Sequence, residues 1–195
     1  MDKAALRRDV LSRRAALEDR ASRSAAIQRH AAVLPEFARA GVVGAYVGVG
    51  DEVETRALLD LVLGRGDVLC VPWRDRADLS LARILSFDEL VPVSFGLLEP
   101  PPAIARARIV DPGRVDLLLI PGVAFDRHGG RLGHGKGFYD RLLERAGPGP
   151  LRAALAFECQ VVGEVPMTAG DERMDLVVTE NGVLRVSART ASLDR

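Results

Sequence analysis

The sequence predicts an α/β fold in which helices cover both faces of a mostly parallel sheet, giving a three-layer α/β/α domain. Short apolar runs alternate along the chain with segments of helical periodicity. The 195 residues can bury one sizeable core, and neither an internal repeat nor a linker divides them. We therefore expect a single domain over residues 1–195, with helices in residues 1–40 and a frayed polar tail at residues 188–195.

The composition is that of an ordinary globular protein and excludes several classes of function. Hydrophobic residues make up 48% of the chain and charged residues 28%. Lysine plus arginine equals aspartate plus glutamate, at 27 each, so no overall field favours nucleic acid and any anion site must be local. No apolar run approaches the length of a membrane span, and the charged N-terminus lacks the apolar region of a signal peptide. We expect a soluble, cytoplasmic monomer without a nucleic-acid or membrane partner.

The N-terminal region is predicted to be helical. Asp2 can N-cap a first helix whose apolar face carries Leu6, Val10 and Leu17, with Arg13 interrupting that face. The basic side chains expected to point away from the face are Arg7, Arg8 and Arg14. A second helix is expected from about residues 18–21 to residue 34, before Pro35, and a short helical turn precedes residue 41.

The next segments alternate between strand and helix. Residues 41–49 are predicted to form a buried strand, residues 55–63 a helix ending at a glycine, and residues 67–73 a second strand. Residues 79–85 alternate and are expected to form an edge strand or half of a hairpin. Residues 91–102 contain four prolines and a glycine, so an extended loop is expected there.

The C-terminal half repeats the alternation. We expect the central strand at residues 115–121, a helix at residues 138–146 that Gly147 and Pro148 stop, and strands at residues 152–157 and 174–179. Cys70 and Cys159 both lie in apolar strand-like runs without metal-ligand spacing. They are expected to be buried reduced thiols.

One stretch, residues 117–143 (LLLIPGVAFDRHGGRLGHGKGFYDRLL), suggests chemistry. An apolar strand leads into a region rich in glycine, and a helix follows. The glycines are Gly129, Gly130, Gly133, Gly135 and Gly137. The basic residues Arg131, His134 and Lys136 lie among them, and Asp140 falls in the first turn of the helix. Backbone N–H groups and a helix N-terminus arranged in this order bind phosphate, and a nearby carboxylate suits magnesium, so a nucleotide site is predicted.

Two common phosphate-binding motifs do not fit this stretch. The Walker A pattern is nearly matched through Gly130, Gly135 and Lys136, but Gly137 lacks the hydroxyl group that binds magnesium. No G-x-G-x-x-G follows a strand directly, so a dinucleotide fold is also disfavoured. The acidic cluster at residues 51–54 follows the first strand and fits either a ligand site or a helix N-terminus.

Five segments in order resemble the 5-formyltetrahydrofolate cyclo-ligase family, also called methenyltetrahydrofolate synthetases. Residues 121–140 are similar to its signature PG-x-a-F-D-x-x-G-x-R-L-G-x-G-x-G-[YF]-Y-D. The other four segments are residues 3–7 (KAALR), 51–55 (DEVET), 96–100 (GLLEP) and 171–180 (DERMDLVVTE). The chain departs from the family pattern at Gly170, where many members have His, and carries His134 at a variable loop position.

The resemblance implies a reaction. Members convert 5-formyltetrahydrofolate, with or without a polyglutamate tail, to 5,10-methenyltetrahydrofolate, and they hydrolyse ATP to ADP and phosphate with Mg²⁺. The formyl oxygen attacks the γ-phosphate, and N10 of the folate displaces phosphate from the resulting iminium phosphate. The alternatives are another ATP-using enzyme, such as a small-molecule kinase, and a folate-binding protein without turnover.

The resemblance also implies roles for individual residues. Lys136 and Arg131 are expected to be catalytic, and Asp140 and Asp171 to bind the metal. The ATP-binding residues implied are Lys3, Ala4, Ala5, Leu6, Arg7, Arg131, Leu132, Gly133, His134, Gly135, Lys136, Gly137, Phe138 and Tyr139. The substrate-binding residues implied are Val47, Glu52, His134, Gly135, Lys136, Gly137 and Phe138. Trp73 and Phe95 are candidates for the pterin pocket, although core packing is the stronger interpretation, and Asp175 is expected to be structural.

Overall fold

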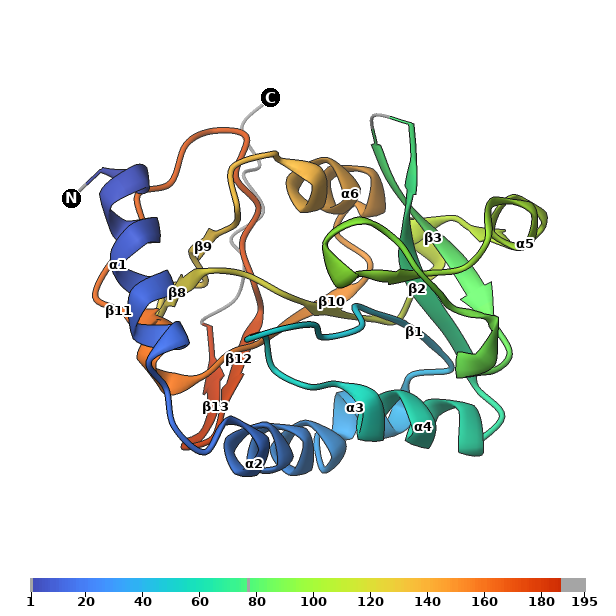
Figure 1. Ribbon diagram of the computed structural model, residues 1–195, viewed down its shortest axis with the longest axis horizontal. Helices are drawn as coiled ribbons and strands as arrows, with labels where there is room; N and C mark the ends of the chain where they lie inside the picture. The colour runs from blue at the N-terminus through green and yellow to red at the C-terminus, as the bar shows by residue number, and fades with distance from the viewer. Residues whose placement is uncertain (1, 77, 187–195) are drawn as a thin grey trace.

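The computed structural model describes residues 2–76 and 78–186 and has an eight-stranded central sheet flanked by helices (Figure 1). The strand order is β13-β12-β10-β7-β1-β2-β3-β6. Their bounds are β1 Val42–Ala45, β2 Val68–Asp75, β3 Asp78–Ile84, β6 Ile109–Val110, β7 Leu117–Ile120, β10 Leu151–Leu155, β12 Leu176–Thr179 and β13 Gly182–Arg185. The middle five strands pair in parallel, and β3, β6 and β13 are added antiparallel. The predicted α/β class is confirmed.

Helices cover both faces of this sheet. The bounds are α1 Lys3–Ala15, α2 Arg20–Ala32, α3 Pro35–Arg39, α4 Arg56–Gly64, α5 Pro102–Ala107 and α6 Phe138–Ala146. Helices α2, α3 and α4 lie on one face, and α6 lies on the other (Figure 1). None of the helices in the described ranges is long and apolar enough to cross a bilayer.

Several sequence-based element predictions are confirmed because their signals are local. Strand β7 is fully buried between β1 and β10, as expected for a central strand. The Asp2 carboxylate accepts a hydrogen bond of 2.7 Å from the Ala5 N–H and so caps α1. Helix α6 ends before Gly147, whose φ of 66° favours glycine.

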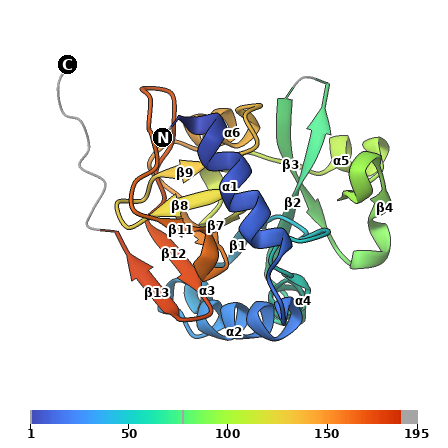
Figure 2. The same ribbon diagram turned by 60° about the vertical axis from the view of Figure 1, so that its left-hand side comes forward.

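A second, smaller sheet was not predicted. It contains β8 Ala124–Asp126, β9 Arg131–Leu132 and β11 Val161–Val162 in the order β11-β8-β9. Helix α1 packs on this sheet through an apolar cluster formed by Leu6, Val10, Val123, Ala124, Leu132 and Val165. Figure 2 shows α1 lying across the front of β8 and β9. The glycine-rich region is therefore not one continuous loop, because β9 lies within it.

Other predictions need correction. The strand expected at residues 41–49 ends at Ala45, and β13 follows the strand that was expected to be last. The loop expected at residues 91–102 contains a small hairpin of β4 Val91–Pro92 and β5 Leu98–Glu99 before α5 begins. Cys70 is buried, whereas Cys159 is only partly buried and lies in the 3₁₀ helix Glu158–Gln160 rather than in a strand. The predicted tail at residues 188–195 lies outside the described residues.

The side chain of Asp126 fixes the turn between β8 and β9. Its carboxylate accepts hydrogen bonds of 2.8 Å from the backbone N–H groups of His128, Gly130 and Val165. A Cβ atom at Gly130 would lie 2.4 Å from the Asp126 Oδ2 atom, so only glycine allows this close approach. The turn that leads into the glycine-rich loop is thus held by one buried carboxylate.

We predict that Asp126→Ala lowers the free energy of unfolding by about 3 kcal/mol, because three backbone donors lose a charged acceptor. Thermal unfolding should report a fall in Tm of roughly 6–12 °C. The matched control is Asp111→Ala, since Asp111 accepts one hydrogen bond of 2.9 Å from the Gly113 N–H in an exposed turn. Equal, small losses in the two variants would contradict the role assigned to Asp126.

Candidate active site

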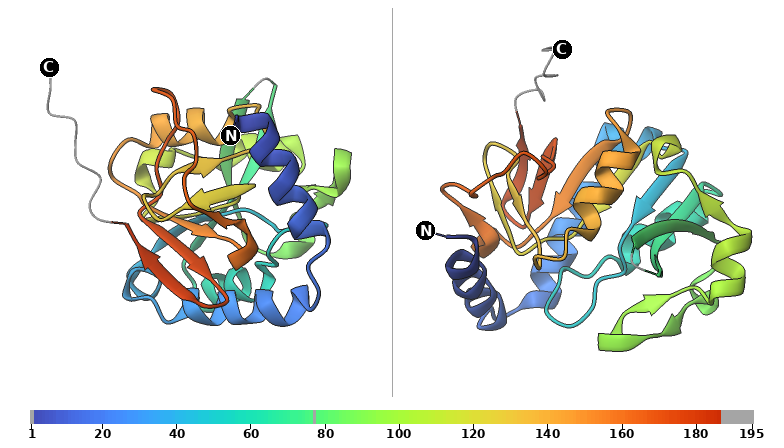
Figure 3. Two further views of the ribbon diagram at one scale, coloured as in Figure 1. Left: turned by 90° about the vertical axis from the view of Figure 1, so that its left-hand side faces the viewer. Right: turned by 90° about the horizontal axis from the view of Figure 1, so that it is seen from above.

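A cavity of about 550 Å³ lies at the carboxyl ends of β1, β2 and β7. Its walls come from segments far apart in sequence: the start of α1, the residues after β1 and β7, strand β2, the β4–β5 hairpin, and the glycine-rich loop with the start of α6. The right-hand view of Figure 3 shows α1 and the green segment that carries β4 and β5 at opposite sides of the molecule. In an open α/β sheet this edge is where ligands bind.

Helix α1 brings two cations to one end of the cavity. Lys3 and Arg7 are one helical turn apart, and both line the cavity. The Arg7 Nε–H donates a 2.8 Å hydrogen bond to the carbonyl oxygen of Gly133. Lys3 forms a close ion pair with Asp171. Arg7 therefore meets the glycine-rich loop 126 residues later, and Lys3 meets the segment that carries Asp171.

Three other residues of the predicted ATP-binding segment do not line the cavity. Ala4 is exposed and Ala5 partly buried, and the Ala5 N–H donates to Asp2. The side chain of Leu6 packs into the core between α1 and the small sheet. This follows from helix geometry, because residues between Lys3 and Arg7 face other directions.

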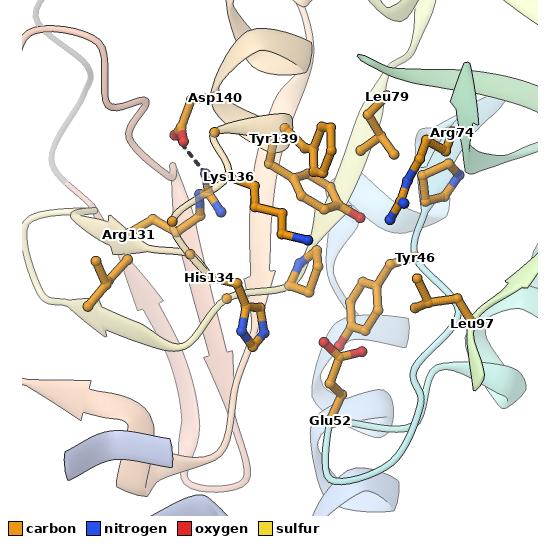
Figure 4. A pocket seen from close by; sticks show the side chains of 18 of the residues that line it. Tyr46, Glu52, Arg74, Leu79, Leu97, Arg131, His134, Lys136, Tyr139 and Asp140 are labelled. Carbon is orange, nitrogen blue, oxygen red and sulfur yellow. Dashed lines mark hydrogen bonds and ion pairs between the residues drawn. The ribbon is translucent and has the colours of Figure 1, made fainter. Parts of the chain in front are cut away.

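The glycine-rich loop forms the floor of the same end. The lining residues from this loop are Gly133, His134, Gly135, Lys136 and Gly137, followed by Phe138, Tyr139 and Asp140 of α6. Gly135 and Gly137 have φ values of 92° and 65°, which side chains rarely adopt. Among the described residues, the Lys136 ammonium group has no carboxylate partner, and its side chain extends into the cavity (Figure 4). Partial removal of the His134 ring from water, together with the nearby Arg14 and Arg7 charges, lowers its pKa.

Arg131 is held rigidly beneath this loop. It belongs to β9, is 4% exposed, and donates a 2.6 Å hydrogen bond from Nη2 to Oδ1 of Asp140, the contact dashed in Figure 4. Its guanidinium carbon lies 5.7 Å from the centroid of the Tyr139 ring. The sequence placed this cation among the glycines of a loop, whereas in the structure it is a buried, ion-paired residue of β9 that still lines the cavity. Leu132 beside it is a core residue.

Asp140 and Asp171, the predicted metal ligands, line the same cavity. The backbone N–H of Glu172 approaches Asp140 Oδ1 at 3.5 Å, which links the two segments. Within residues 2–76 and 78–186, no group of three or more acidic, histidine or cysteine side chains could hold a metal ion. Two carboxylates still fit magnesium, which binds hard oxygen atoms and keeps several water or phosphate oxygens as further ligands. In this structure Asp140 is paired with Arg131, and Asp171 with Lys3.

The opposite end of the cavity is more apolar and contains Glu52. Val47, which was predicted to bind substrate, also lines the cavity, as does Tyr46. Burial raises the pKa of Glu52, although a hydrogen bond from Val49 N–H and the Arg14 charge act against the rise. Figure 4 shows the carboxylate beside the Tyr46 ring. Glu52 therefore adds an anion or a hydrogen-bond acceptor to a part of the lining that also includes the charged residues Arg74 and Glu99.

The sequence analysis missed part of the lining, and of the two aromatic candidates for the pterin pocket it placed Trp73 correctly in the core but not Phe95. The lining residues that it missed are Tyr46, Pro72, Arg74, Leu79, Leu97, Leu98, Glu99, Pro121 and Gly122. Tyr46 and Pro121 directly follow strands β1 and β7, so the carboxyl-end rule could have found them. Trp73 is a core residue beside Ala82 and Ala105, whereas Phe95 is 86% exposed, which makes it neither core nor lining.

Comparisons with known proteins agree on one family. A family model described as the 5-formyltetrahydrofolate cyclo-ligase family matches residues 1–180. The chain belongs to this family. The mitochondrial 5-formyltetrahydrofolate cyclo-ligase of Arabidopsis thaliana is 31% identical over 194 aligned residues, covering 87% of this chain and 70% of that one. The 5-formyltetrahydrofolate cyclo-ligase of Mycolicibacterium smegmatis is 39% identical over 144 residues, covering 70% and 72%.

Solved structures support the same assignment. The NMR structure of Aquifex aeolicus 5,10-methenyltetrahydrofolate synthetase superposes with a TM-score of 0.83 at 36% identity, covering 100% of this chain and 97% of that one. The Mycoplasma pneumoniae synthetase shares the fold, with a TM-score of 0.73 at 22% identity. The resemblance read from the cyclo-ligase motifs is therefore confirmed at the level of the family, and the residue roles that it implies remain predictions.

We predict that Lys3→Met raises the pKa of Asp171. Partial burial raises this pKa, but hydrogen bonds from Lys3 and Thr168 outweigh burial and lower it below the usual range. The stability that the lowered pKa contributes is present at neutral pH and is lost as the pH falls through the folded-state pKa. Carboxyl NMR titration would measure the change, and Lys3→Arg is the control that keeps the charge. An unchanged Asp171 pKa in Lys3→Met would contradict the ion pair.

Proposed function

We propose that the protein converts 5-formyltetrahydrofolate to 5,10-methenyltetrahydrofolate and hydrolyses ATP to ADP and phosphate. The carrying observation is that one cavity joins a cationic glycine-rich end to an apolar end that contains a carboxylate. A phosphate donor fits the cationic end. A folate fits the other end, where a carboxylate of the protein can recognise its pterin ring. The named relatives, which are cyclo-ligases and methenyltetrahydrofolate synthetases, support the proposal.

The proposed chemistry activates a poor leaving group. The formyl oxygen attacks the γ-phosphorus and ADP departs, which leaves an iminium phosphate on N5. The N10 amine then adds to the formyl carbon and loses its proton. Inorganic phosphate leaves with the former formyl oxygen, so the atoms balance. The protein's main tasks are to align the two substrates and to stabilise charge on the transferred phosphoryl group.

The residues of the basic end suit these tasks. We assign phosphate binding to Lys3, Arg7, Lys136 and the N–H groups of residues 133–137. Within the described residues Lys136 has no carboxylate partner, and its flexible four-carbon stem can let the ammonium group follow the transferred phosphoryl group. Arg131 is already fixed by Asp140, so we assign it an electrostatic role with little reorganisation.

The apolar end suits the folate. Glu52 can accept two parallel N–H bonds from the amide-like edge of a pterin. Phe138 and Tyr139 present aromatic surface between the two ends, where the formyl group would meet the phosphate. We further propose that the protein acts as a cytoplasmic monomer, although the Arabidopsis relative is named as mitochondrial.

Magnesium would be held by Asp140 and Asp171 and would neutralise phosphate oxygens when bound. Both carboxylates must then share or release their present partners, Arg131 and Lys3. Those two cations lie beside the phosphate site, so phosphate oxygens can replace the carboxylates as their partners.

A spectrophotometric assay tests the proposed function directly. Purified protein is mixed with 5-formyltetrahydrofolate, ATP and Mg²⁺, and the near-ultraviolet absorbance of methenyltetrahydrofolate is followed. The proposal requires product that appears only when ATP and Mg²⁺ are both present. Phosphorylation of the folate without cyclisation would indicate a kinase, and tight folate binding without product would indicate a binding protein.

We predict that Arg7→Ala raises the KM for ATP about tenfold or more, as the loss of a charge-assisted contact of about 1.5–3 kcal/mol would. Arg8→Ala is the matched control, because Arg8 is exposed on the same helix and does not line the cavity. Steady-state kinetics at saturating folate would measure both. Equal ATP kinetics in the two variants would mean that this helix face is merely solvated.

We predict that Asp140→Asn lowers kcat by on the order of a hundredfold, the scale seen when one charge-stabilising group is removed. Extra Mg²⁺ should restore part of the loss if Asp140 is a metal ligand, and none if its only task is to hold Arg131. Asp175→Asn is the control. The Asp175 carboxylate accepts a 2.8 Å hydrogen bond from Arg152 N–H at the start of β10, so this change should affect stability more than metal dependence. Wild-type activity of Asp140→Asn at limiting Mg²⁺ would show the metal assignment to be wrong.

A further inference from the structure

Arg14 is buried at the end of α1, although the helical pattern placed it on the solvated side. It is 3% exposed. Its Nε and Nη2 atoms lie 3.1 Å and 2.8 Å from the two carboxylate oxygens of Asp51, a bidentate pair. Its Nη1 atom donates a longer bond of 3.4 Å to the carbonyl oxygen of Gly122. All three nitrogen atoms of the guanidinium group thus form hydrogen bonds within the protein.

These contacts join three walls of the cavity. Arg14 lies on the helix that carries Lys3 and Arg7, Asp51 directly precedes Glu52, and Gly122 follows the central strand. Neither Arg14 nor Asp51 lines the cavity, so the pair does not touch a ligand there. Any effect on the ligand must pass through a neighbouring residue.

Glu52 is the neighbour that depends most on this pair. In the described part of the chain its carboxylate accepts one hydrogen bond, of 3.3 Å, from the Val49 N–H. That donor belongs to the same turn, in which Gly50 has a φ of 62°. Local bonds within the turn cannot fix its direction relative to the rest of the protein. The Asp51 carboxylate supplies an anchor outside the turn, on a buried arginine.

We propose that Arg14 and Asp51 are positioning residues for the folate, because their ion pair holds the turn that presents Glu52 to the cavity. This inference rests on the proposed function and deepens it. Arginine suits the role better than lysine, since its rigid fork fixes both the distance and the plane of the carboxylate. The pair also fixes the position of the Glu52 turn relative to α1, the helix that carries Lys3 and Arg7.

A double-mutant cycle separates positioning from a merely structural role. Asp51 is partly open to solvent, with 35% of its side chain exposed, and asparagine has almost the same shape as aspartate, so Asp51→Asn adds no steric barrier to folding. We expect Asp51→Asn to raise the KM for 5-formyltetrahydrofolate about tenfold in the wild-type background. In a Glu52→Gln background the further rise should be less than about twofold, because the group being positioned is already impaired. The KM for ATP should change less than about twofold in either background.

Glu180→Gln is the matched control. Glu180 forms a 2.6 Å ion pair with Arg23 of α2, has 8% of its side chain exposed, and does not line the cavity. It should lower Tm while leaving the folate KM unchanged, and its effect should add to that of Glu52→Gln. An Asp51→Asn effect of the same size in both backgrounds, or equal rises in both KM values, would overturn the inference.

A second variant tests whether loss of stability causes the rise in the folate KM of Asp51→Asn. Arg14→Met combined with Asp51→Asn removes the unpaired buried charge, so Tm should recover relative to Asp51→Asn alone. The folate KM should stay high if the pair positions Glu52, and recovery of KM together with Tm would overturn the inference. Wild-type protein that neither binds nor converts the folate would instead refute the proposed function itself, and with it this extension.

Discussion

The cavity depends on the docking of α1 against the small three-stranded sheet. Leu6 and Val10 supply the apolar contact, and a neighbouring stripe on the same helix carries Lys3, Arg7 and Arg14. The spacing of four and seven residues keeps these three cations on one face. Each one reaches a different segment: Asp171, the Gly133 carbonyl oxygen and Asp51. One helix therefore holds three walls of the cavity at fixed distances from each other.

This arrangement explains why the two ends of the cavity differ in chemistry. The cationic end contains backbone N–H groups and the Lys136 ammonium group, which has no carboxylate partner among the described residues, and both suit an anion. The other end combines apolar side chains with the partly buried Glu52 carboxylate, which suits a flat ring with a polar edge. The carboxylates near the cationic end are already paired with Arg131 and Lys3. Binding of a magnesium–nucleotide complex would accordingly exchange partners within a preformed set of charges.

The central strand, the start of α1 and the end of α6 could be predicted from sequence because each depends on nearby residues: an apolar run, an aspartate N-cap and a glycine stop. Strands β8, β9 and β11 could not, since strands of two or three residues have no periodicity and exist only through tertiary pairing.

Site residues could be predicted where a sequence motif contains them. Prediction failed for residues whose position depends on contacts with distant parts of the chain. Arg14 was expected to point away from the apolar face because helical periodicity cannot distinguish an arginine with a buried partner from a solvated one. Its partner, Asp51, is 37 residues away in sequence. Arg74 and Leu79 line the cavity from a β-hairpin whose position depends on the whole sheet. The glycine-rich loop was predicted to belong to the site and it lines the cavity, but the burial of Arg131 depends on pairing between β8 and β9.

The most direct test of the account is a crystal structure with a non-hydrolysable ATP analogue, Mg²⁺ and 5-formyltetrahydrofolate bound together. The account predicts the terminal phosphate among Lys3, Arg7, Lys136 and the loop N–H groups. It also predicts the pterin edge on Glu52 and the formyl oxygen facing that phosphate. Phosphates bound away from α1 and the glycine-rich loop, or a pterin that does not contact Glu52, would contradict it.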